Sequence, residues 1–265
     1  MKIIFLLFFL SNFMFGEDYW YFQKKEGKSF NQILDEAIGT FEKELPKNPN
    51  SFLLRANLLK VLYFKGTFMG LEKEEAKKIL SKGKVIGEEG KEILKKELKI
   101  EKIKEPNEVY EKGKHIEGLG EFFFWDSACW GQWALLYGKM KAAKEGAAKK
   151  ILISAEIALL FDEKMEDGGP HRVLGRLHHQ TPKIPLITGW VSKEKALEHL
   201  KKAIELGPED PMNYLFLGEL YLDLGQKEKA KEIFEKGLKL SIREKKEPAD
   251  IDSVEKIKNN LKNLK

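Results

Sequence analysis

The chain has 265 residues, of which 42% are hydrophobic and 34% are charged. A hydrophobic share of this size supports a folded core and excludes a chain that is disordered throughout. The formal net charge is only +5, which gives little support to nucleic-acid binding. Lysine and glutamate alternate along the sequence instead of forming long blocks of one sign, a pattern typical of solvent-facing helix surfaces.

The N-terminal stretch differs in composition from the rest of the chain. An apolar run from Ile3 to Phe15 follows a short basic start, and Gly16 precedes two acidic residues. The run is shorter than the ~20 residues of a membrane span and fits the apolar region of a secretory signal. We expect residues 1–16 to be a signal peptide and residues 17–265 to form one exported, periplasmic domain. The alternatives are an uncleaved membrane anchor and a buried N-terminal helix.

Beyond this stretch the sequence predicts helices only. No segment alternates apolar and polar residues for long enough to indicate a strand. Residues 29–45 are expected to form a single capping helix. Residues 51–100 are expected to form a helical pair whose second helix is long and charged.

An aromatic block, FFFWDSACWGQW, opens the next unit, which we expect over residues 120–160. Most of the block is expected in the core, because stacked helices need large apolar residues where they meet. The alternative is a hydrophobic pocket or a partner surface. Cys129, the single cysteine, lies inside the block and is expected to be a small buried hydrophobic residue that forms no disulfide.

The clearest repeat signal lies in the unit expected over residues 211–240. Gly218 and Tyr221 stand in its first helix, and Ala230 and Phe234 stand in its second. These spacings match the tetratricopeptide repeat (TPR) of about 34 residues, in which small residues let paired helices approach each other.

The preceding unit, residues 170–207, has the same pattern, but an unusually long loop, QTPKIPLITGWVS, separates its two helices. Residues 251–264 are expected to form a terminal helix with a polar outer face, as the end of a solenoid requires. The predicted fold class is therefore all-α, a TPR-like solenoid or bundle of helical hairpins with about four irregular repeats plus capping helices.

Basic side chains mark a candidate ligand site. Arg172, Arg176 and His179 are spaced so that they share one face of a helix. Guanidinium groups bind carboxylates in a bidentate manner, so a site for an anion or carboxylate is one interpretation. The competing interpretation is that these groups pair with acids of neighbouring helices, such as Glu219 or Asp223.

Trp130, Trp133 and Lys139 complete the candidate ligand site, and apolar walls beside arginine would suit an amphipathic carboxylate. We expect no metal, because His171 and His178 are two helical turns, ~10 Å, apart. We also expect no cofactor and no enzyme activity, because the sequence has no P-loop, no G-x-S-x-G motif and no Cys–His pair at nucleophile spacing.

Three blocks resemble the T component of TRAP transporters: FFFWDSACWGQWALLYGK, EDGGPHRVLGRLHHQTPKIPL and KALEHLKKAIELGPEDPMNYLFLGELYLDLGQKEKA. The resemblance covers roughly residues 30–240. The residues that match the family blocks are Trp125, Trp130, Trp133, Gly168, Gly169, His171, Arg172 and Gly175.

The resemblance implies a periplasmic, TPR-like accessory protein that docks a transporter's solute-binding subunit. It also implies a ligand-lined channel suited to small hydrophobic carboxylates and a capacity to form homotrimers. Unlike the lipoprotein members of the family, this chain has no lipid-acceptor cysteine after the apolar run. The alternative function is a general cell-envelope TPR scaffold that binds a peptide or protein partner.

Overall fold

The computed structural model describes residues 27–264, so the expected signal peptide lies outside the described residues. Within them, all regular secondary structure is helical, which confirms the predicted all-α fold class. The helices are α3 (Phe30–Glu44), α4 (Phe52–Phe68), α5 (Lys73–Leu98), α6 (Pro106–Gly113), α7 (Leu119–Tyr137), α8 (Lys139–Lys144), α9 (Ala147–Phe161), α10 (Met165–Gln180), α11 (Lys193–Leu206), α12 (Pro211–Asp223), α13 (Lys227–Leu238), the 3₁₀ helix η1 (Glu244–Lys246) and α14 (Glu247–Asn263).

Several helices begin where the sequence supplies a cap for their free backbone N–H groups. Ser29 and Gln32 form a capping box at the start of α3. The side chains of Ser51, Ser192 and Asp210 accept backbone hydrogen bonds at the starts of α4, α11 and α12. These starts are set by local chemistry, which is why the sequence pattern locates them well.

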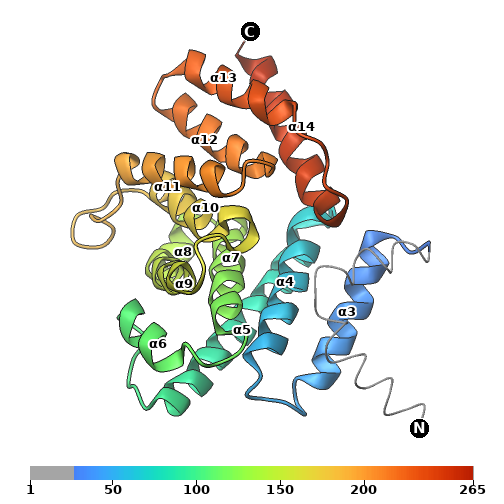
Figure 1. Ribbon diagram of the computed structural model, residues 1–265, viewed down its shortest axis with the longest axis vertical. Coiled ribbons are helices and arrows are strands. Elements are labelled where there is room, and N and C mark those ends of the chain that lie inside the picture. The colour runs from blue at the N-terminus through green and yellow to red at the C-terminus, as the bar shows by residue number, and fades with distance from the viewer. Residues whose placement is uncertain (1–26, 265) are drawn as a thin grey trace.

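The helices stack as antiparallel pairs, and the chain forms a TPR-like solenoid. The pairs are α4 with α5, α7 with α9, α10 with α11, and α12 with α13. Figure 1 shows α12 and α13 above α10 and α11, with α9, α7, α4 and α3 side by side below them. Helix α14 packs on α12 and α13, and its N-terminal end returns to α4.

The aromatic block lies in the core. All its aromatic side chains are buried, as is Cys129, so the core interpretation of the block is confirmed. Trp130 and Trp133 meet edge to face, with ring centroids 5.4 Å apart. They pack with Leu80 of α5 and Ile151 of α9, so α7 is the central helix of this part of the stack.

Helices α5 and α7 approach closely because α5 presents glycine to α7 three times. A Cβ atom added at Gly83 would lie 3.0 Å from the Cys129 sulfur, and one at Gly90 would lie 2.6 Å from the Phe122 ring. One at Gly87 would lie 2.0 Å from a carboxylate oxygen of Asp126. The glycines therefore set the distance between the two helices.

Two features of the fold differ from the sequence expectation. The short helices α6 and α8 were not predicted, because each is about two turns or less and offers too few positions to show a period. The terminal helix begins at Glu247, before the expected residue 251, with a proline in its first turn. The predicted long loop between α10 and α11 is present, and it projects away from the helices at the left of Figure 1.

Candidate binding surface

The start of α10 is a sharp kink made by three consecutive left-handed residues. Glu166, Asp167 and Gly168 have φ angles of 48°, 60° and 75°. Two of them carry side chains, for which this conformation is unfavourable. Other interactions must therefore hold this kink in place.

An ion-pair network holds this kink. Glu166 lies 2.8 Å from the Lys60 ammonium of α4 and 3.0 Å from that of Lys246. Burial alone would raise the pKa of Glu166, but these two lysines outweigh burial and lower the pKa to about 2. Asp167 pairs with Arg243 at 2.6 Å. The network joins α4, α10 and the segment that leads into α14.

Arg172 belongs to the same network and is buried. Its Nη1 atom donates to Asp210 at 3.2 Å and to Asn213 at 2.9 Å. Its Nη2 atom donates to the backbone carbonyl of Glu166 at 3.1 Å. The guanidinium therefore bonds the kink to the start of α12, and a ligand would reach it only by displacing these partners.

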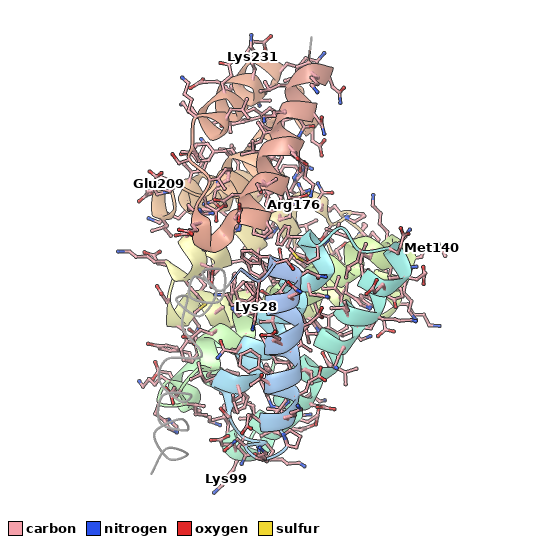
Figure 2. All side chains as sticks on the ribbon, turned by 90° about the vertical axis from the view of Figure 1, so that its right-hand side faces the viewer. Lys28, Lys99, Met140, Arg176, Glu209 and Lys231 are labelled. Atoms are coloured by element: carbon pink, nitrogen blue, oxygen red, sulfur yellow. The ribbon has the colours of Figure 1, made fainter. Side chains whose placement is uncertain are left out.

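Arg176 and His179 also face acids of α12. Arg176 donates a short hydrogen bond to Glu219, and its guanidinium stands 4.4 Å from the ring centroid of Phe216. The Nε2 atom of His179 lies 2.7 Å from Asp223. The name α10–α12 patch is used below for Arg176, His179, Phe216, Glu219 and Asp223. Figure 2 shows Arg176 where the orange C-terminal helices meet the yellow part of the ribbon.

The patch carries both signs of charge. The side chains of Arg176 and Glu219 are 24% and 25% exposed, and that of Asp223 is 56% exposed. Burial lowers the pKa of His179, which favours the neutral imidazole. Glu219 and Asp223 are the acids that the competing interpretation named. A patch of this kind has no net preference for an anion.

The six residues of the predicted ligand site are not brought together. Trp130 and Trp133 pack in the cluster that holds Leu174 and Leu177, whereas the arginines face α12. Lys139 lies exposed at the start of α8. The predicted site is divided because the two groups of residues lie on different sides of α10.

The family-block glycines are explained by packing. A Cβ atom at Gly169 would lie 2.6 Å from the Phe124 ring, and one at Gly175 would lie 2.6 Å from Leu200. Gly168 lies against the backbone of Ala203. Trp125, also from these blocks, is buried against Phe124 with ring centroids 4.8 Å apart. The three glycines let α10 approach α7 and α11 closely.

Sequence reasoning missed a histidine cluster between α10 and α11. The Nδ1 atoms of His171 and His199 lie 2.9 Å apart, and the ring of His178 stacks on that of His199 at 6.0 Å. His199 was overlooked because it is 28 residues from His171. Among residues 27–264, no three His, Cys, Asp or Glu side chains are placed to hold a metal ion.

The cluster makes stability depend on pH. Burial, followed by the charges of His171 and His178, lowers the pKa of His199 to about 4. The unfolded chain therefore binds more protons below about pH 6.5, and the free energy of unfolding falls as the pH drops towards 4. Allowing for the partly exposed ring, we expect His199 to account for about 1.5 kcal/mol of the fall between pH 7 and pH 5.

Urea unfolding at several pH values tests this expectation. The variant His199→Phe should lose that part of the pH dependence, whereas His115→Phe, at an exposed position, should keep all of it. Protonation of Glu166, which would break its ion pairs, does not contribute to the pH dependence between pH 7 and pH 5, because the pKa of this carboxyl group is about 2. Equal pH dependence in the wild type and His199→Phe would contradict the assignment.

A cleft of about 490 Å³ lies between the start of α3, the end of α4 and the first turns of α14. Its apolar lining includes Phe68, Pro248 and Ile251, and its acidic lining includes Asp252 and Glu255. None of the predicted ligand-site residues lines it. In the described part of the chain, no helix is both long and apolar enough to cross a membrane.

Comparison with known proteins gives partial matches. The model of the family described as "Regulator of microtubule dynamics protein 1-3" matches residues 190–265, which contain α11 to α14 but not α10. No curated protein matches the chain. Among solved structures, the chain is similar to a monomeric mutant of IFIT1 with Gppp-AAAA and to yeast Tom70.

The IFIT1 structure has a TM-score of 0.37 and 16% identity, and the match covers 87% of this chain and 55% of that chain. For Tom70 the TM-score is 0.30 and the identity is 17%, with 88% of this chain and 60% of that chain covered. The chain thus spans somewhat more than half the length of each.

Proposed function

We propose that this chain is a non-enzymatic helical-repeat scaffold that binds a protein partner through the α10–α12 patch. The observation that carries the proposal is the position of Arg176, which stacks on Phe216 and bonds to Glu219 while its side chain stays partly exposed. Arginine and aromatic side chains dominate the energetic centres of protein interfaces. Here they stand on the first helices of two successive pairs.

The charges of the patch favour a protein segment over a small anion. Glu219 already neutralises Arg176, and Asp223 adds a second negative charge beside His179. A protein segment with both positive and negative side chains could bond to Arg176 and to the two acids. A small carboxylate ligand would instead be repelled by the negative charges of Glu219 and Asp223. The pairing also holds the guanidinium in one geometry before binding, which lowers the entropy cost of association.

A photo-crosslinking amino acid in place of Phe216 tests the proposal in the full chain. We expect it to capture a discrete protein partner, while the same amino acid in place of the exposed Val85 of α5 does not. Adding Arg176→Ala should weaken capture at least about tenfold, since interface arginines at such positions contribute more than about 1.4 kcal/mol.

Thermal unfolding of the variant distinguishes lost binding from lost folding. Because the Arg176–Glu219 pair is partly solvent-exposed, its removal should cost no more than about 1 kcal/mol of stability. A folded Arg176→Ala variant that captures the partner as well as the parent protein would contradict the proposal.

A narrower proposal follows from the sequence resemblance: the partner is the periplasmic solute-binding subunit of a TRAP-type transporter. The supporting observation is the family blocks, among them the G-G-P-H-R segment that begins at Gly168. Mass spectrometry of the captured protein tests it. A solute-binding subunit supports the accessory function, whereas recovery of assembly or secretion factors only would leave the general scaffold and overturn the transporter proposal.

A further inference from the structure

The loop between α10 and α11 exposes aliphatic side chains that the repeat architecture does not require. Leu186 is fully exposed, Ile187 is 68% exposed and Ile184 is 42% exposed. They lie in the middle of the segment that joins Gln180, the end of α10, to Lys193, the start of α11, and this loop projects from the helices in Figure 1. Apolar side chains gathered at a projecting tip usually mark a contact surface.

Hydrogen bonds hold the loop in a defined shape. The buried hydroxyl of Thr188 donates to the carbonyl of Pro182 at 2.5 Å and accepts from the backbone N–H of Ile184 at 2.9 Å. The N–H of Thr188 donates to the carbonyl of Ile184 at 2.9 Å. Leu186, at the tip, has a φ of 66°, which a leucine adopts only where its surroundings impose it. The aliphatic tip is thus preorganised.

The base of the loop is anchored on α10. Val191 is buried, and the ring of Trp190 meets His178 edge to face with centroids 5.5 Å apart. The backbone N–H of Ser192 donates to Nδ1 of His178 at 3.2 Å. Because both ends are tied to α10, the tip is held out in solvent at a fixed place.

The tip is too small for a stable protein interface of ordinary size. Three aliphatic side chains expose at most a few hundred Å², whereas a specific interface buries about 800 Å² on each partner. Leucine and valine are also under-represented among interface hot spots, and the tip carries no arginine or exposed aromatic residue.

The charges beside the tip indicate a different partner. From Thr181 to Ser192 the chain carries Lys183 and no acidic residue, whereas Lys193, which follows, bonds to the carbonyl of His179 and is succeeded by Glu194. Aliphatic side chains at the apex, the exposed Lys183 beside them and a partly exposed tryptophan at the base match the chemistry of a bilayer surface with anionic lipids. We propose that this loop inserts Ile184, Leu186 and Ile187 into the headgroup boundary of such a membrane.

The buried cysteine makes a local test available. Because Cys129 is the chain's single cysteine and is inaccessible, Leu186→Cys introduces one reactive thiol at the tip. An environment-sensitive fluorophore is attached there in the full chain, and vesicles of phosphatidylcholine with one quarter phosphatidylglycerol are added. We expect a blue shift of the emission, and binding several-fold weaker with pure phosphatidylcholine or when salt is raised from 0.1 to 0.5 M.

The matched control is Met140→Cys with the same fluorophore, at an 89% exposed apolar residue of α8. Figure 2 shows Met140 at the edge of the molecule, far from the labelled Arg176. Its emission should not change with vesicles. Equal shifts at both positions would show that another part of the chain drives binding and would overturn the proposal.

A second variant tests the tip without a label. Ile184→Glu combined with Ile187→Glu should weaken vesicle binding at least tenfold, while Val85→Glu should leave it unchanged. The emission of the fluorophore at position 186 could stay unchanged with vesicles but shift to the blue at high protein concentration or with a captured partner. In that case the tip is a protein contact and the membrane proposal is wrong.

Discussion

Replacing Asn213 with leucine is expected to lower the free energy of unfolding by about 3–4 kcal/mol, because one buried amide holds three helices together. Asn213 is fully buried at the start of α12. Its Nδ2 atom donates to the carbonyls of Asp167, Ala203 and Gly207, and its Oδ1 atom accepts from Arg172 at 2.9 Å.

A leucine of similar size would remove one hydrogen bond from each of three carbonyls and one from the buried guanidinium of Arg172, and it would place an apolar side chain among these polar groups. The expected result is a large fall in the urea midpoint without a change in helix content at low urea. Asn259→Leu, at an exposed position of α14, is the control and should change stability by less than about 0.5 kcal/mol. If Asn213→Leu unfolded with the same midpoint as the wild type, the amide network would contribute nothing measurable.

Replacing Gly87 with alanine is expected to cost about 2–3 kcal/mol, although alanine is the better helix former. The new Cβ atom would lie 2.0 Å from a carboxylate oxygen of Asp126. That carboxylate cannot move aside freely, because Asp126 is buried and bonds to Lys91 at 2.7 Å and to Ser154 at 2.7 Å. The helices must separate or the ion pair must distort.

Gly131→Ala on α7 is the matched control. Gly131 is also inside a helix, but a Cβ atom there would meet nothing within 4 Å. Alanine at this position should stabilise the protein by up to about 1 kcal/mol through helix propensity. Stability changes of the same sign at both positions would show that the close approach of α5 and α7 does not limit the side chain at residue 87.

The two proposed surfaces lie next to each other. Lys193, at the base of the loop, donates to the carbonyl of His179 at 2.9 Å and lies 3.8 Å from Asp223 of the α10–α12 patch. A membrane contact at the tip of the loop would therefore place the patch close to the bilayer. Each proposal has its own test, so the failure of one leaves the other standing.

The sequence predicted the longer helices because their signals are local. The 3.6-residue period, the capping residues and the small residues of the repeat pattern act over a few turns, so the α12–α13 pair could be read from Gly218, Tyr221 and Phe234 alone. The burial of the aromatic block could be predicted for the same reason, since hydrophobicity is a property of each side chain.

The role of the basic residues was decided only by the tertiary structure. The helical period placed Arg172, Arg176 and His179 on one face, but it could not say what that face meets. Their partners Asp210, Glu219 and Asp223 are 38, 43 and 44 residues away. An arginine that binds a ligand and an arginine that bonds to a neighbouring helix have the same spacing pattern in the sequence around them. The difference lies in the packing of α10 against α12, because charge pairing depends on distance in space and not on spacing along the chain.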